Sequence, residues 1–314
     1  MTSKAIATLT MNPTIDISST IDEFVLEHKM RCSAPQRDPG GGGINVARVV
    51  HRLGGKAMVL YIAGGATGMM LHKLLRREGI EDRRIEIEKL TRENFTLSET
   101  TSGRQLRFVF PGPELRRSEW QQCLDMLGMF IPRPAYIVAS GSLPPGVPDD
   151  FYARAAQVAR RIDARFILDT AGEPLRMAME EGVFLIKPNR RELETATGRN
   201  LSEPVAQEEA CRELVAGGKV ETVVLTLGGG GALLTSQELQ LRAGPTQVQV
   251  VSAVGAGDSF VGGLTYALAR NGKLEEAFWY GMAAVPAAVL TPGTELCRPK
   301  DVERLFKELR PQKP

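Results

Sequence analysis

Short apolar runs recur along this chain, and each is followed by a segment with helical periodicity. The two clearest units pair residues 57–63 with an expected helix around 69–78, and residues 135–139 with one around 149–161. Such runs are apolar enough to be buried on both faces of a parallel sheet. The pattern predicts an α/β fold, with a doubly wound, mostly parallel sheet flanked by helices. We assign to this sheet the runs 5–12, 57–63, 135–139, 166–169, 184–187 and 222–227.

The remaining helix signals lie after the glycine-rich residues 40–43 and in the C-terminal third of the chain. The sequence contains no internal repeat and no stretch that resembles an interdomain linker. We therefore expect one main domain with an accessory piece. The C-terminal helices are expected at 258–271, 274–288 and 300–309.

Two stretches break the alternation, at residues 14–37 and about 91–111. In the second, the strand-like residues 95–98 and 106–110 flank a turn at 102–103. We expect antiparallel strands outside the main sheet. Because a small isolated sheet is marginal in water, its apolar face needs cover from the main domain or from a second copy of the chain. The prediction is a β-sheet lid that is shared in a homodimer.

Composition excludes several classes of protein. The 39 Lys and Arg residues nearly balance 37 Asp and Glu, so no strong field would attract nucleic acid or an anionic bilayer. No stretch offers the ~20 apolar residues of a membrane span, and the N-terminus lacks the apolar core of a signal peptide. The four cysteines are far apart, which argues against a zinc site or a disulfide framework. We expect a cytoplasmic protein without nucleic-acid or membrane partners.

The most informative segment is a small-residue turn, Gly255-Ala256-Gly257, followed by Asp258 and a helical pattern. The free N–H groups of this turn could converge on a phosphate, helped by the positive end of the helix dipole. Asp258 beside that phosphate could accept a proton from an attacking hydroxyl, as a general base does in phosphoryl transfer. The alternative is that Asp258 only caps the helix.

A second glycine cluster, residues 40–43, also leads into a helix. Ordering each glycine costs ~0.5–1 kcal/mol relative to alanine, so close approach to a ligand explains four in a row better than a structural loop does. Asn45, on the first helical turn, could offer a donor and an acceptor to a sugar hydroxyl, or could make a local backbone bond. No Gly-Lys-Ser/Thr follows the glycines, which disfavours a P-loop ATPase.

Three further signals leave alternatives open. Asp16 follows the first strand, where it could bind vicinal hydroxyls or simply be solvated. Asn189 and Glu192 are three residues apart, a spacing that suits either a hydrated Mg²⁺ near phosphates or a helix capping box. The glycines of 226–232 could accommodate a nucleotide or form an ordinary hairpin loop.

The glycine-rich residues 40–45, the Asn189/Glu192 pair and the Gly255–Asp258 turn occur in the order typical of the ribokinase-like (pfkB) carbohydrate kinases. The chain resembles this family over essentially its whole length, which implies a single ribokinase-like domain over 1–314 with a lid. Within the family it is similar to the minor bacterial 6-phosphofructokinase branch. The segments that carry this similarity are 29–35, 64–68, 91–94 and 140–147.

The resemblance implies transfer of the γ-phosphate of ATP to O1 of fructose 6-phosphate. Asp258 would be the base and Gly255, Ala256 and Gly257 the anion hole. The positions implied to contact the sugar are Asp16, Lys29, Gly41, Gly42, Asn45, Ser142 and, at its phosphate, Arg92. Those implied for metal and phosphates are Lys187, Asn189 and Glu192, and those for the nucleotide pocket are Thr226, Gly228 and Gly231. A K⁺ ion would match Ser252, Val254, Ala288, Thr291 and Gly293.

Other readings remain open at the level of sequence. Kinases resembling 1-phosphofructokinase and tagatose-6-phosphate kinase often carry Gly-Gly-Lys-Gly in the sugar loop, whereas this chain has four glycines. That difference favours fructose 6-phosphate without excluding tagatose 6-phosphate, since one hydroxyl is worth only a few kcal/mol. A non-catalytic sugar-phosphate sensor is an alternative of another class. A dinucleotide-dependent dehydrogenase is disfavoured because the first strand lacks a G-x-G-x-x-G turn.

Overall fold

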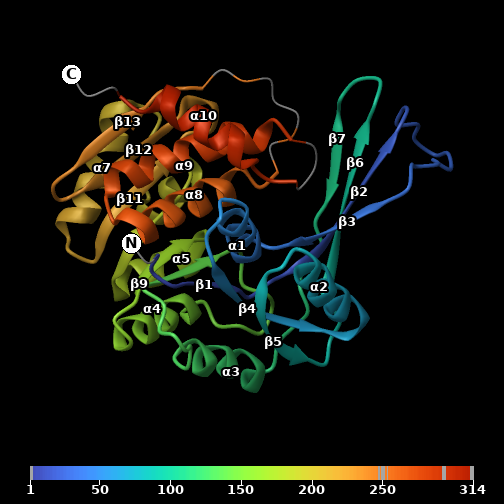
Figure 1. The fold of residues 1–314 in the computed structure, drawn as a ribbon, viewed down its shortest axis with the longest axis horizontal. Helices are drawn as coiled ribbons and strands as arrows, with labels where there is room; N and C mark the ends of the chain where they lie inside the picture. Colours follow the sequence, from blue (N-terminus) through green and yellow to red (C-terminus); the bar gives the residue numbers. More distant parts are fainter. Residues whose placement is uncertain (1–2, 247, 249–251, 253, 292–294, 312–314) are drawn as a thin grey trace.

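A nine-stranded sheet forms the centre of the computed structural model, which describes residues 3–246, 248, 252, 254–291 and 295–311 (Figure 1). Its strand order is β13-β12-β11-β10-β9-β8-β1-β4-β5. Pairing is parallel from β11 to β5, and β12 and β13 are added antiparallel at one edge. The bounds are β1 Ile6–Thr10, β4 Ala57–Gly64, β5 Glu81–Ile87, β8 Tyr136–Ser140, β9 Arg165–Asp169, β10 Val183–Ile186, β11 Val220–Thr226, β12 Ala232–Ser236 and β13 Gln240–Ala243.

Helices cover both faces of this sheet, because side chains alternate between two hydrophobic cores. In β8, Ile137 and Ala139 join one core, while Tyr136 and Val138 join the other. The first core packs against α3 Arg117–Leu127, α4 Phe151–Arg161, α5 Gly172–Glu181, α6 Arg190–Thr197 and α7 Pro204–Ala216. The second packs against α1 Gly42–Arg52, α8 Ala256–Asn271, α9 Leu274–Val289 and α10 Pro299–Leu309. The doubly wound α/β prediction is thus confirmed.

A four-stranded lid projects from one side of the main body (Figure 1). Its order is β3-β2-β6-β7, with bounds β2 Thr14–Ile21, β3 Gln36–Gly40, β6 Arg92–Glu99 and β7 Gln105–Phe108. The lid is confirmed, but the expectation of antiparallel strands is wrong for the central pair, since β2 and β6 are parallel. The reason is that β2 and β6 directly follow β1 and β5, whose carboxyl ends share one edge of the main sheet. Both lid strands therefore start at that edge and run outward.

The apolar face of the lid is covered along β2 but exposed toward the β7 edge. Ile15 and Ile17 of β2 are buried in a third core, with residues of α1, of β4 and of α2 Gly65–Arg77. Ile17, Phe95 and Phe108 are register partners across β2, β6 and β7, so they share one face. Unlike Ile17, Phe95 on β6 and Phe108 on the edge strand β7 are 39% and 47% exposed. Part of the apolar face therefore lies open in the single chain.

The sequence did not predict the strands β5, β12 and β13 or the helices α3, α5 and α7. β5 is an edge strand in which exposed charged residues interrupt the apolar ones, so it lacks the continuous apolar run of the central strands. α1 begins within the glycine run, at Gly42, and not after it. Among the helices of the described residues, none combines the length and the apolarity that crossing a bilayer requires.

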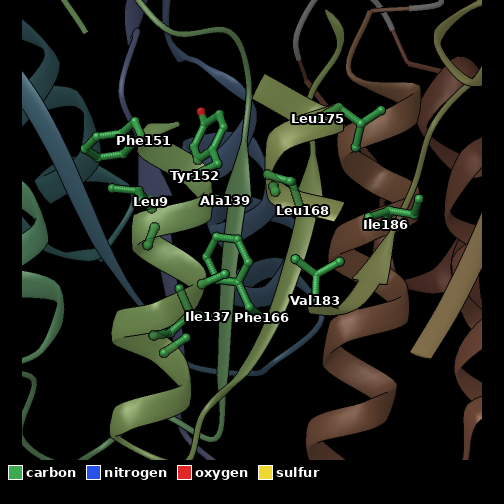
Figure 2. Packing of buried hydrophobic residues seen from close by; sticks show 14 of the residues in the cluster. Leu9, Ile137, Ala139, Phe151, Tyr152, Phe166, Leu168, Leu175, Val183 and Ile186 are labelled. Carbon is green, nitrogen blue, oxygen red and sulfur yellow. The ribbon is translucent and has the colours of Figure 1, made fainter. Parts of the chain in front are cut away.

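The central sheet should be sensitive to cavities in its core. Leu168 of β9 is fully buried in the cluster of Figure 2, so Leu168→Ala should lower the free energy of unfolding by about 2–5 kcal/mol. Urea denaturation would measure the loss. Leu90→Ala is the matched control, because Leu90 is 62% exposed and its truncation should cost less than about 1 kcal/mol. Equal losses in both variants would contradict the assignment of this core.

Candidate active site

Polar side chains gather where the parallel strands of the main sheet end. Ser140 ends β8 and Asp169 ends β9, while Lys187 directly follows β10. The crevice outside the carboxyl ends of the strands is where open α/β sheets bind ligands. A cavity of about 480 Å³ lies there, lined among others by Ser140, Ser142, Asp169, Glu192 and Asp258.

Asp258 reaches this cavity from the first turn of α8. Its Oδ2 accepts a hydrogen bond from Nδ2 of Asn45 at 2.9 Å, and its Oδ1 accepts one from Oγ of Ser140 at 3.4 Å. The N-cap of α8 is Gly255, in the left-handed conformation with φ 72°. The alternative that Asp258 serves as the helix cap is therefore wrong, and its carboxylate is directed at α1 and β8.

The environment of Asp258 brings its pKa closer to neutral pH than that of an ordinary aspartate. Burial raises the pKa of Asp258 to about 6, and the neighbouring Asp169 carboxylate contributes to the rise. Hydrogen bonds from Asn45 and Ser140, together with the charge of Lys187, oppose it. Above about pH 6 the group is mostly ionised, so it can accept a proton under neutral conditions.

The turn before α8 presents a site suited to an anion. The first N–H groups of a helix have no partner within it, and the dipole adds positive potential there. Lys187 lies close, since a β-carbon built on Gly257 would be 3.7 Å from the Lys187 ammonium. Burial alone would lower the pKa of Lys187, but the ion pair with Asp169 at 3.1 Å raises it overall, and Lys187 stays charged. A buried positive charge thus faces the start of α8.

The glycine run brings α1 directly against the strand ends. A β-carbon on Gly42 would collide with Ser140, and one on Gly43 would collide with the carbonyl of Leu9. Gly41 has φ 114°, a conformation that favours glycine. The interpretation of this run as room for a ligand is therefore incomplete, because two of the glycines are required by contact with β1 and β8.

Asn45, in the first turns of α1, binds two side chains. The sequence had suggested a sugar hydroxyl or a local backbone group as its partner. Its amide donates to Asp258, and its Oδ1 accepts from Nη1 of Arg48 at 3.3 Å. Arg48 itself is 1% exposed. The side chain thus links a buried arginine to the carboxylate of α8.

The junction of the main sheet and the lid holds the other residues predicted for the sugar. Asp16 of β2 accepts a hydrogen bond from Asn94 at 3.2 Å, and burial raises its pKa while Asn94 and Arg92 oppose the rise. The Arg92 guanidinium donates to the carbonyls of Asn12 and Phe110, both at 2.9 Å.

Ser142 and Lys29 are placed differently. Oγ of Ser142 accepts from Nδ2 of Asn12 at 3.1 Å and lines the same cavity as Asp258. Lys29 is exposed on the β2–β3 connection, which Figure 1 shows at the outer end of the lid. The single chain therefore brings Ser142 to the site but leaves Lys29 apart from it.

A second cavity, of about 360 Å³, adjoins the other side of the α8 N-terminus. Its apolar wall includes Phe260, Met282 and Val289. The cavity is also lined by Thr226 at the end of β11, by Gly228 and Gly231 of the glycine turn that follows, and by Asn189. Gly257 lines this cavity while Asp258 lines the first, so the two cavities meet at the start of α8.

Asn189 and Glu192 form the capping box of α6. The Asn189 N–H donates to Oε2 of Glu192 at 2.8 Å, and the Glu192 N–H donates to Oδ1 of Asn189 at 3.0 Å. Burial raises the pKa of Glu192, Asp169 contributes, and Lys187 lowers it. A divalent cation would relieve the repulsion between the carboxylates of Glu192 and Asp169. The residues present therefore fit Mg²⁺. The described part of the chain contains no cluster of three or more His, Cys, Asp or Glu suited to a metal ion, so the remaining ligands would be water and phosphate.

Four of the five positions matched to K⁺ lie where the turn before α8 meets the end of α9. The N–H of Ser252 donates to the carbonyl of Val289 at 3.2 Å, and the N–H of Val254 donates to Oγ of Ser252 at 3.3 Å. Oγ of Thr291 donates to the carbonyl of Ala288 at 2.8 Å. The fifth position, Gly293, lies outside the described residues.

Sequence reasoning missed three residues of this site: Ser140, Asp169 and Arg48. Ser140 and Asp169 stand at the ends of apolar runs that were assigned to the parallel sheet. Their position at the carboxyl end of a strand was the available signal. Arg48 carried no such signal, because a lone arginine in a helical segment is ordinarily exposed.

Comparison with known proteins agrees with this geometry. The family model described as pfkB family carbohydrate kinase matches residues 9–301. ATP-dependent 6-phosphofructokinase isozyme 2 of Mycobacterium tuberculosis is 46% identical over 302 residues, which cover 96% of this chain and 89% of that protein. The protein of the same name from Escherichia coli is 40% identical over 305 residues, covering 97% and 98%.

Solved structures give the same result. The crystal structure of phosphofructokinase-2 from Escherichia coli in complex with fructose-6-phosphate has a TM-score of 0.91 at 38% identity, covering 98% of this chain and 99% of that one. The Escherichia coli protein has also been solved in complex with potassium and as a tetrameric inhibited form. From the family model and these relatives, the chain belongs to the pfkB family of carbohydrate kinases.

Proposed function

We propose that this protein transfers the γ-phosphoryl group of ATP to O1 of fructose 6-phosphate, giving fructose 1,6-bisphosphate and ADP. The observation that carries the proposal is the position of the α8 N-terminus. It separates a polar cavity that contains Asp258 from a partly apolar cavity with a glycine-rich wall. An acceptor in the first cavity and a nucleotide in the second would meet at this turn. The names of the two relatives at 46% and 40% identity support the same reaction.

In the proposed reaction, Asp258 accepts the proton of the O1 hydroxyl as O1 attacks the γ-phosphorus. A new O1–P bond forms, the bond from the γ-phosphorus to the bridging oxygen breaks, and ADP leaves. The N–H groups of Gly255, Ala256 and Gly257 and the Lys187 ammonium offset negative charge on the transferring group. Bound with ATP, Mg²⁺ would neutralise charge on the phosphate oxygens, with Asn189 and Glu192 holding its water ligands.

The proposed sugar site extends from Asp258 to the base of the lid. Asp16 would bind hydroxyls of the sugar, and Arg92 would bind the 6-phosphate by exchanging its carbonyl partners for charged oxygens. Gly41, Gly42, Asn45 and Ser142 would form the remaining wall, and Lys29 would act from the lid. Thr226, Gly228 and Gly231 would contact the nucleotide. K⁺ would bind at Ser252, Val254, Ala288, Thr291 and Gly293, in line with the potassium complex of the Escherichia coli relative.

ADP release from Mg-ATP, measured with a panel of sugars, tests the proposed substrate. The panel contains fructose 6-phosphate, tagatose 6-phosphate, fructose 1-phosphate, fructose and ribose, compared by kcat/KM. We expect the highest value for fructose 6-phosphate. Preference for tagatose 6-phosphate or fructose 1-phosphate would overturn the substrate but keep the kinase. Silence across the panel would favour a non-catalytic sensor.

The proposed base has its own test in Asp258→Asn, which keeps the shape of the side chain but cannot accept the proton as a carboxylate does. Turnover should fall by about 100-fold to 10,000-fold, while the affinity for the sugar phosphate, measured by calorimetry, stays nearly unchanged. Asp125→Asn, on the exposed face of α3, is the matched control and should keep full turnover. An active Asp258→Asn enzyme would remove Asp258 as the base.

We also propose that two copies of the chain pair through their lids. Phe95, Leu106, Phe108 and Phe110 are between 39% and 48% exposed, and Phe95 and Phe110 meet edge to face. A second lid would cover this apolar surface, which a small sheet does not stably expose to water. The Escherichia coli relative has a tetrameric form, so self-association occurs within the group.

The lid pairing predicts a dimer in sedimentation equilibrium. Leu106→Ser combined with Phe108→Ser should shift the protein to monomer, because both side chains belong to the exposed apolar face. Ile131→Ser is the control, since Ile131 is 83% exposed but lies between α3 and β8, outside the lid strands. A wild-type protein that is strictly monomeric would contradict the proposal.

A further inference from the structure

Arg48 of α1 is a charged residue that the interior holds almost completely buried, with 1% exposure. Its guanidinium forms a fork with the carboxylate of Glu78, which follows α2 as its C-cap residue. Nε lies 2.9 Å from Oε2 and Nη2 lies 2.7 Å from Oε1. This bidentate pair balances the buried charge and fixes the plane of the guanidinium.

The third nitrogen of the guanidinium points toward the candidate active site. Nη1 donates to the carbonyl of Pro39 in lid strand β3 at 3.1 Å and to Oδ1 of Asn45 at 3.3 Å. Nδ2 of Asn45 in turn donates to Oδ2 of Asp258 at 2.9 Å. A continuous chain of hydrogen bonds therefore runs from the end of α2 through α1 to the start of α8.

The donors and acceptors in this series of hydrogen bonds allow only one orientation of the Asn45 amide. A guanidinium has only donors, and an ionised carboxylate has only acceptors. With Arg48 on one side and Asp258 on the other, Oδ1 must face Arg48 and Nδ2 must face Asp258. Without Arg48, the amide would be free to turn its oxygen toward Asp258 whenever that group is protonated, because a carboxylic acid has a hydrogen to donate.

We propose that Arg48 is a positioning residue that holds the Asn45 amide in the orientation that donates to the Asp258 carboxylate. This inference rests on the proposed role of Asp258 as the base. Arg48 touches no reacting atom and acts through Asn45. Its bond to Pro39 fixes the same guanidinium relative to the lid.

A consequence for the pH profile follows from the charges around Asp258. Burial and the charge of Asp169 raise its pKa, the hydrogen bonds from Asn45 and Ser140 and the charge of Lys187 lower it, and the Glu192 carboxylate lines the same cavity. Losing the Asn45 donation raises the pKa of Asp258 further. At mildly acidic pH, a larger fraction of the enzyme then carries a protonated Asp258 and is inactive. The acid limb of kcat/KM therefore moves to higher pH when the amide is released.

The test compares Arg48→Met with wild type by kcat/KM for the best sugar phosphate, from about pH 5.5 to about pH 9. The acid limb should move upward, so that the loss is about tenfold greater at the acid end than at the alkaline end. Arg48→Lys, which keeps a donor and the charge, should restore part of the profile. Arg52→Met is the matched control, one turn farther along α1, and should leave the acid limb in place.

A double-mutant cycle separates action through Asn45 from a general effect on structure. In an Asn45→Ala background, Arg48→Met should cause no further shift in the acid limb of the kcat/KM profile. If Arg48→Met alone does not fold because Glu78 loses its partner, Arg48→Met combined with Glu78→Met removes both charges and takes its place.

Three results would overturn the role of Arg48: an unmoved acid limb in the folded variant, an equal shift in Arg52→Met, or a full further shift in the Asn45→Ala background. These outcomes are distinct from failure of the proposed function. That failure would appear as full turnover in Asp258→Asn or as an inactive wild-type protein.

Discussion

The close contact of α1 with the ends of β1 and β8 is the constraint on which the site depends. Only glycine at positions 42 and 43 lets the helix lie this near, because any β-carbon there would meet Ser140 or the backbone of Leu9. That proximity places Asn45 within hydrogen-bond distance of Asp258, although 213 residues separate them in the sequence. A helix displaced by the width of one methyl group would break this bond. The glycines therefore determine the geometry around Asp258 through the backbone contact that they allow.

The charges of the site fit the proposed transfer of a proton and a phosphoryl group at one place. Three carboxylates, Asp169, Glu192 and Asp258, line one cavity, and burial raises the pKa of two of them, Glu192 and Asp258. Lys187 is the buried positive charge between them, paired with Asp169 and close to Gly257. A carboxylate with a pKa of about 6 is ionised at neutral pH yet basic enough to take a proton. The same excess of negative charge fits the proposal that a metal ion binds here together with the phosphates of ATP.

The sequence was sufficient for the central strands of the main sheet and for singling out the turn at Asp258, because both depend on local patterns. Apolar runs identify buried strands, and a glycine turn before a helix marks a candidate site for an anion. The contact of Asn45 with Asp258 could not be predicted in this way, because helical spacing gives no partner in another element. The pairing of β2 with β6 was likewise hidden, since strand patterns carry no direction. Asn189 and Glu192 show a different limit: the spacing that suits a metal also suits a capping box, and the capping bonds are present.

The lid is joined to the active site without a spacer. β3 ends at Gly40, Gly41 is the N-cap of α1, and α1 begins at Gly42. One extra residue inserted at this junction would rotate the first turn of α1 by about 100° and carry Asn45 away from Asp258. The β2–β3 connection at the outer end of the lid is exposed and free of regular structure, so changes of length there leave the strand ends untouched. Length variation in this chain is therefore expected to be tolerated at the outer end of the lid and excluded at its inner end.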